Sequence, residues 1–154
     1  MKKGFFDHRY LLDSDTAVDL YNKFAKDLPI YDYHCHLSPK DLAEDRVYTN
    51  IGELWLEGDH YKWRMMRACG VPEEKITGSA SWHDKFIAFA SIMPRIIGSP
   101  VYHWAHLELK VYFDIVRPMN ADSAEEIWEG ICTSEVDGGS DWTTAVVSSN
   151  RAKT

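Results

Sequence analysis

The stretch Ile30-Tyr31-Asp32-Tyr33-His34-Cys35-His36-Leu37 decides how this sequence is interpreted. It is apolar and aromatic, and prolines at positions 29 and 39 border it, so it predicts a short buried β-strand. Side chains alternate between the two faces of a strand, which places His34 and His36 on the same face. Neutral imidazole is a good ligand for zinc and similar divalent ions, so this pair is a candidate metal site. The alternative is a pair of hydrogen-bonded polar residues at the end of a strand.

The composition narrows the class of protein. A chain of 154 residues with 45% hydrophobic residues is long enough and apolar enough for one domain with a core. The net charge of -7, without a cluster of basic residues, argues against nucleic acid or an anionic membrane as a partner. No apolar run approaches the roughly 18 residues of a membrane span, and charged residues at positions 7 and 9 interrupt any signal peptide. Three widely spaced cysteines, Cys35, Cys69 and Cys132, indicate a reducing cytoplasm and no disulfide framework.

Helical patterns surround the predicted strand, and about seven helices are expected. The clearest covers residues 14–27, where Ser14 or Asp15 caps a helix whose apolar face carries Ala17, Leu20, Tyr21, Phe24 and Ala25. The other helices are expected to begin near these capping residues: Ser38, Asn50, Asp59, Ser81, Ser99, and Asp122 or Ser123. One buried strand cannot stand alone, because its backbone groups need neighbouring strands. The sequence therefore predicts that further strands are missing.

The chain changes character near position 131. Residues 132–154 are rich in serine, threonine, glycine and aspartate and show no hydrophobic period. We expect residues 1–130 to form the folded part and residues 131–154 to form a tail with little order.

A second notable stretch is Trp55-Leu56-Glu57-Gly58-Asp59-His60-Tyr61-Lys62-Trp63-Arg64, which gathers aromatic and titratable residues around a helix start. A helix N-terminus favours anions, so a carboxylate substrate could bind there within reach of His60 and Tyr61. On these residues alone, a helix cap beside a packed aromatic cluster is the slightly favoured interpretation.

A third stretch is Tyr102-His103-Trp104-Ala105-His106-Leu107-Glu108-Leu109-Lys110. His103 and His106 share a helix face and could bind a metal, although their spacing is not that of the His-x-x-x-His zinc helices. A helix that packs through Trp104 and Leu107 is the favoured interpretation, and the roles of the two histidines stay open.

Taken together, the three stretches closely resemble the N-terminal third of the uronate isomerase family, also called glucuronate isomerase, within the amidohydrolase superfamily. The motifs are Asp32-Tyr33-His34-Cys35-His36-Leu37-Ser38-Pro39, residues 55–64 and residues 102–109, and the opening segment with Tyr10-Leu11-Leu12-Asp13 is similar as well. The resemblance runs from about Phe5 to Trp128, and three long motifs in the same order make a chance match improbable.

The resemblance implies a (β/α)8 TIM barrel with a helical insertion after its first strand. The expected fold class of this chain is thus mostly α with one buried strand, an N-terminal fragment of an α/β barrel. The implied activity is aldose–ketose isomerisation of D-glucuronate to D-fructuronate and of D-galacturonate to D-tagaturonate in the cytoplasm. In the family comparison His34 and His36 match metal ligands for a divalent ion, expected to be zinc. Tyr61 matches a catalytic residue, and His60 matches its neighbour at the hexuronate substrate.

The sequence departs from the family in length, since a TIM barrel takes about 250 residues. An aspartate and an arginine that complete the family's site near the last barrel strand have no match here, and residues 132–154 do not resemble the family. We therefore expect a fragment with an incomplete active site. A metal-dependent hydrolase of the same superfamily and a non-catalytic helical module remain alternatives, and the stretch Gly58-Asp59-His60-Tyr61 favours the isomerase. Whether the chain forms a homo-oligomer stays open.

Overall fold

The computed structural model describes Asp7, residues 9–29, His34, His36, residues 38–44 and residues 46–133. Within these residues the chain is mostly helical, with seven α-helices, one π-helical segment and two short 3-10 helices. The predicted predominance of helix is confirmed. None of the helices in this part of the chain is long and apolar enough to cross a bilayer.

The predicted strand at residues 30–37 falls mostly outside the described residues, which include only His34 and His36 of it. Neither of these two lies in a strand, both are exposed, and the described residues form no strand at all. The prediction of burial is thus wrong at the two positions where it can be compared. The physical reason is that a strand needs neighbouring strands to satisfy its backbone and cover its faces, and the described residues supply none.

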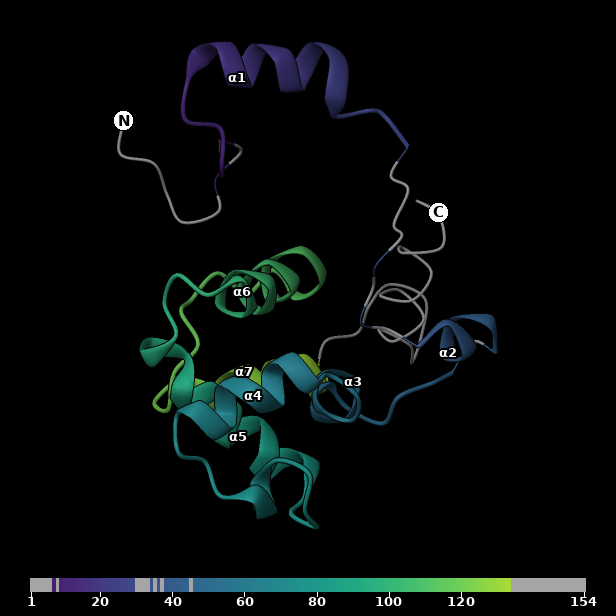
Figure 1. The fold of residues 1–154 in the computed structure, drawn as a ribbon, viewed down its shortest axis with the longest axis vertical. Coiled ribbons are helices and arrows are strands. Elements are labelled where there is room, and N and C mark those ends of the chain that lie inside the picture. Colours follow the sequence, from purple (N-terminus) through teal and green to yellow (C-terminus); the bar gives the residue numbers. More distant parts are fainter. Residues whose placement is uncertain are drawn as a thin grey trace.

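The N-terminal helix lies where the pattern predicted it, but its apolar face is not buried. Helix α1 spans Asp15–Leu20 and continues as the π-helical segment η1 over Tyr21–Ala25. Ser14 caps it by accepting a hydrogen bond from the backbone N–H of Ala17. Leu20 and Phe24 are exposed, Phe24 to 68%. Figure 1 shows α1 set apart from the cluster formed by α3 to α7.

Three short helices follow, and each begins at the predicted capping residue. Helix α2 spans Pro39–Ala43, α3 spans Ile51–Leu56 and α4 spans His60–Ala68. The side chains of Ser38, Asn50 and Asp59 accept hydrogen bonds from the first free backbone N–H groups of these helices. Gly70, with φ of 79°, takes the left-handed conformation that ends α4.

The longer helices form the second half of the described chain. The 3-10 helix η2 spans Glu73–Lys75, α5 spans Trp82–Ile92, and the 3-10 helix η3 covers Met93–Arg95 around Pro94. Helix α6 spans Pro100–Phe113 and α7 spans Ala124–Thr133. Ser81 and Ser99 cap α5 and α6 as predicted, and the carbonyl of Ser123 accepts the first hydrogen bond of α7. Helix α7 extends past the boundary predicted near 131, because Ile131 is fully buried. Residues 134–154 lie outside the described part.

Helix α5 is central to the core. It contacts α3, α4 and α7, and its Phe86 and Phe89 are completely buried. Helix α3 approaches the start of α5 so closely that a Cβ on Gly52 would lie 2.5 Å from the carbonyl oxygen of Trp82. Glycine at 52 is therefore a packing requirement.

Helix α6 packs through a different face from the predicted one. Trp104 and Leu107, expected to pack, are 45% and 40% exposed. The buried face consists of Val101, Tyr102, Ala105, His106 and Leu109. Both faces carry apolar residues at helical spacing, so the pattern alone could not distinguish them.

Substitution of two phenylalanines, one in the core and one on an exposed helix face, tests the assignment of the core. Phe89→Ala should lower the free energy of unfolding by about 3–5 kcal/mol, because it removes a fully buried ring and leaves a cavity. Phe24→Ala, on the exposed face of η1, should change it by less than about 0.5 kcal/mol. Urea unfolding followed by circular dichroism would measure both, and equal losses in the two variants would contradict the assignment of the core.

Candidate active site

The four predicted site residues line one hollow. A cavity of about 220 Å³ is lined by His34, His36, His60 and Tyr61 together with Gly58 and Asp59. These residues come from two segments: His34 and His36 precede α2, and the others lie at the start of α4. The structure thus brings together residues that were predicted from separate motifs.

Ring contacts define how the four side chains meet. The His36 ring stacks on the ring of Tyr61, with centroids 4.7 Å apart and an interplanar angle of 16°. His60 lies beside both, 6.2 Å from His36 and 4.8 Å from Tyr61. His34 meets His36 edge to face at 5.5 Å. His36 is therefore the centre of the cluster.

Asp59 joins the two segments. Its Oδ2 lies 3.1 Å from Nδ1 of His36 and accepts a hydrogen bond of 2.8 Å from Nζ of Lys62. The Asp59 residue is only 7% exposed, and burial raises its pKa, but Lys62 and His36 outweigh burial and hold the pKa below the usual range. The group is therefore a carboxylate at neutral pH. A carboxylate only accepts, so in a neutral His36 this contact favours the tautomer with the proton on Nδ1 and the lone pair on Nε2.

Two of the backbone N–H groups at the start of α4 are already hydrogen-bonded within the chain. Oδ1 of Asp59 accepts hydrogen bonds from the N–H groups of Tyr61 and Lys62. The positive end of the helix is therefore already compensated by this carboxylate. A substrate in the hollow would meet the side chains of His60 and Tyr61 instead.

The described residues supply part of a metal site. His34 and His36 present two imidazoles at the hollow, and the Asp59–His36 pair resembles the carboxylate–histidine arrangement that supports metal ligands. Among the described residues no group of three or more histidines, cysteines or acids is placed to hold a metal ion. Catalytic zinc sites usually have three protein ligands, so this donor set is chemically suitable but incomplete.

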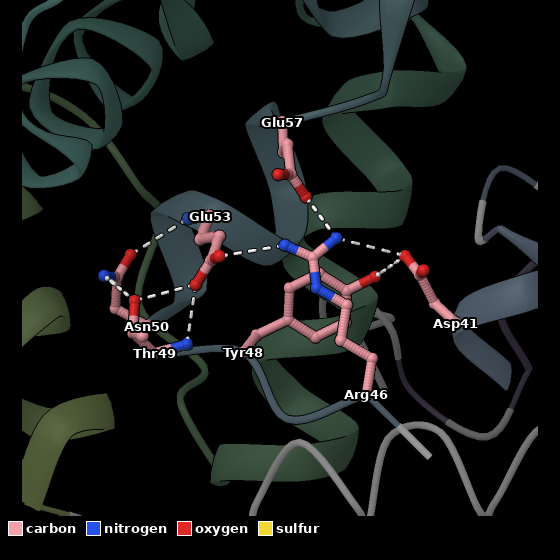
Figure 2. A network of polar contacts seen from close by, with 7 residues as sticks. All are labelled: Asp41, Arg46, Tyr48, Thr49, Asn50, Glu53 and Glu57. Carbon is pink, nitrogen blue, oxygen red and sulfur yellow. Dashed lines mark hydrogen bonds and ion pairs between the residues drawn. The ribbon is translucent and has the colours of Figure 1, made fainter. Parts of the chain in front are cut away.

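A charged network beside the hollow fixes the start of α3 and is shown in Figure 2. The Arg46 guanidinium forms ion pairs with Asp41 at 3.3 Å, Glu53 at 3.0 Å and Glu57 at 2.6 Å, and lies over the Tyr48 ring. The Tyr48 hydroxyl donates to Asp41 at 2.7 Å. Asp41 belongs to α2, so Arg46 ties α2 to α3. Nothing in the sequence pattern indicated this network.

The network borders a second hollow. This cavity of about 270 Å³ shares three residues with the first one, and its lining comprises His36, Ser38, Asp41, Tyr48, Leu54, Glu57, Gly58 and Asp59. The two hollows therefore adjoin each other at His36, Gly58 and Asp59.

A half-buried polar contact, which the sequence did not reveal, joins α3 to α6. Nε1 of Trp55 donates to Oε2 of Glu108 at 2.6 Å, and Nζ of Lys62 lies 5.8 Å from the Trp55 ring centroid. Burial raises the pKa of Glu108. The only sequence signal for this contact was the position of Glu108, a single acidic residue between apolar residues of a helix.

The third motif contributes one residue to the cluster and one to the core. Trp104 meets the edge of His36 at 5.9 Å, so its exposed face belongs to the site. His106 is buried: its Nδ1 donates to the carbonyl of Tyr102, and its Nε2 accepts from the N–H of Met119. Burial also lowers the pKa of His106. It is a neutral structural residue, and its two bonds hold the loop after α6. His103 meets the Tyr10 ring edge to face.

Comparison with known proteins gives consistent matches. The family model described as glucuronate isomerase matches residues 1–140. The uronate isomerase of Bacillus pumilus is 55% identical over 129 residues, which cover 84% of this chain and 27% of that protein. That of Caldanaerobacter subterraneus is 56% identical over 127 residues, covering 82% and 27%. The crystal structure of uronate isomerase from Thermotoga maritima matches with a TM-score of 0.76 at 45% identity, covering 83% of this chain and 28% of that one. The chain thus spans 27% of the length of these curated relatives.

The charge on Glu53 should make part of the stability pH-dependent. Burial raises the pKa of Glu53, but hydrogen bonds from Thr49 and Arg46 outweigh burial and hold the pKa below the usual range of a glutamate. A lowered pKa stabilises the fold above the unfolded value, and this contribution disappears as pH falls through the folded pKa. Glu53→Gln should therefore cost about 1–3 kcal/mol of unfolding free energy at neutral pH, and less below pH of about 4.

Urea unfolding at a series of pH values measures this difference. Glu44→Gln is the matched control, since Glu44 is exposed and its partner Lys40 lies 4.0 Å away. A cost of Glu53→Gln that stays constant down to pH of about 2.5 would contradict the role of the charge.

Proposed function

We propose that this chain, which belongs to the glucuronate isomerase family, is the N-terminal part of a uronate isomerase. The observation that carries the proposal is the convergence of His34, His36, His60 and Tyr61 on one hollow. The reaction is interconversion of aldose and ketose hexuronates, D-glucuronate with D-fructuronate and D-galacturonate with D-tagaturonate. The site in this chain supplies one wall of the complete active site.

The whole protein would be a (β/α)8 barrel, to which this chain contributes the first strand and a helical insertion. The exposed apolar face of α1 and η1 supports this architecture, because Leu20 and Phe24 would be covered by the rest of the barrel. The free thiols of Cys69 and Cys132 support a cytoplasmic location.

The chain's residues suit separate parts of the isomerisation. The reaction moves a proton between C2 and C1 through an enediol, which requires an acid, a base and stabilisation of an oxyanion. Tyr61 is 37% exposed and lines the hollow, where its hydroxyl can exchange a proton with a sugar oxygen. His60, beside it, can hydrogen-bond the substrate.

The divalent ion, which we take to be zinc, would be held by His34 and His36. When bound, it would polarise substrate oxygens. His36 is prepared for this role by Asp59, which leaves Nε2 as the ligand nitrogen. The further ligands would come from the part of the protein that this chain does not contain.

Zinc binding by the 154-residue chain tests the metal assignment. Two imidazoles should bind zinc weakly, because catalytic sites usually have three protein ligands. Equilibrium dialysis should show uptake that falls to background in His34→Ala and in His36→Ala. His83→Ala is the matched control, since His83 is exposed and pairs with Glu125 away from the cluster. Equal uptake by wild type and the His34/His36 double alanine variant would refute the assignment.

A chimera tests the function directly. Residues 1–133 of this chain would replace the matching segment of the Bacillus pumilus relative, and conversion of D-glucuronate to D-fructuronate would be measured. We expect turnover by the chimera and none by the 154-residue chain by itself, since catalysis needs a closed pocket and the chain spans 27% of its relatives' length.

Variants of the chimera assign the turnover to the site. Tyr61→Phe should reduce kcat by about 100-fold or more, as expected for loss of an acid–base group. Tyr21→Phe, an exposed tyrosine in η1, serves as control. An inactive but folded chimera, or one unaffected by Tyr61→Phe, would count against the proposed function.

A further inference from the structure

We propose that Asp59 is the positioning residue of this site, which orients the imidazole of His36 and couples it to the start of α4. The proposal rests on the proposed function for the role of His36 in the site. The contact between Asp59 and His36 is itself seen in the structure. The sequence motif predicts only a helix cap at Asp59.

Asp59 is held rigidly on the α4 side. Its Oδ1 caps the helix through the N–H groups of Tyr61 at 3.0 Å and Lys62 at 3.3 Å. Its Oδ2 accepts the ammonium of Lys62 at 2.8 Å, and the pair is buried. Three donors from α4 thus fix the carboxylate independently of His36.

The same carboxylate then constrains His36. The bond from Nδ1 to Oδ2 lies at the edge of the imidazole, whereas Tyr61 stacks on its face. The hydrogen bond to Asp59 selects the tautomer of His36, and the stacking on Tyr61 fixes the plane of its ring. Together they leave one orientation in which Nε2 is the lone-pair nitrogen. Asp59 is buried and acts through His36, so it positions a ligand and is not a catalytic residue.

The competing explanation is that Asp59 only caps α4. Two substitutions separate the roles, because asparagine and serine are both good N-caps. In Asp59→Asn one oxygen remains for the cap, and the amide N–H₂ faces Nδ1 of His36 as a donor. In Asp59→Ser the side chain is too short to reach His36. Both variants should keep the helix and lose the acceptor for the Nδ1 proton.

The test is the tautomer of His36, read by long-range proton–nitrogen NMR correlations in the metal-free 154-residue chain. Spectra at about pH 8 observe histidines in the neutral form. Wild type should show His36 protonated at Nδ1. Asp59→Asn and Asp59→Ser should both move this proton to Nε2, with unchanged helix content by circular dichroism and unchanged His60 signals. Asp84→Asn, which alters a carboxylate at the start of α5, is the matched control and should leave His36 unchanged.

Each other outcome overturns the proposal. These outcomes are a wild type already protonated at Nε2, variants that keep the Nδ1 proton, or variants in which helix content and His60 change along with His36. The last result would show that Asp59 acts as a cap alone.

A zinc titration on the same samples separates this proposal from the proposed function. Loss of a carboxylate behind a histidine ligand should weaken zinc binding by about 10–100-fold. If wild type and Asp59→Ser bind zinc with equal affinity although the tautomer has changed, Asp59 does not position His36 for metal binding, and the proposal is overturned. Absence of zinc binding at His34 and His36 in wild type, with the tautomer result intact, would reject the metal site of the proposed function and leave the positioning of His36 in place.

Discussion

The indole of Trp55 joins its own helix, α3, to three other helices. Its ring lies 6.0 Å from the rings of both Phe86 and Phe89 in α5, and its Nε1 donates to Glu108 in α6. Lys62 of α4 lies over the same ring. One buried residue of α3 thus contacts α4, α5 and α6. Because aromatic burial contributes strongly to stability, the arrangement of these helices depends on this contact.

The candidate site is attached to that core through charge. Lys62 lies over Trp55 and donates to Asp59, and Asp59 in turn contacts His36. A buried ammonium and a buried carboxylate are costly unless paired, so each holds the other in place. The position of His36 is therefore determined by the packing of α3 and α4. The Arg46 network joins α2 to α3 through its ion pairs with Asp41 and Glu53.

Local chemistry was predictable from the sequence, and long-range pairing was not. Ser14, Asn50 and Ser99 were identified as caps because a capping bond spans only two or three residues. The four candidate site residues were predicted from their motifs and from the family resemblance, and the structure brings them to one hollow. The Trp55–Glu108 bond joins positions 53 apart and leaves no periodic signal. The predicted buried face of α6 was wrong for a related reason. Trp104 lies on a face that is as apolar as the buried one, so the sequence pattern does not distinguish the two faces.

The misassigned face of α6 and the exposed face of α1 have a common explanation. An apolar face predicts burial, but the partner that buries it need not lie within the same part of the chain. Phe24 in η1 and Trp104 in α6 are both exposed here, and Trp104 contacts His36 at the candidate site. The chain spans 27% of its relatives' length, and under the proposed function the remainder of the protein would cover these faces. The helices and their caps are set by local interactions, whereas burial of an apolar face depends on partners that are distant in the sequence.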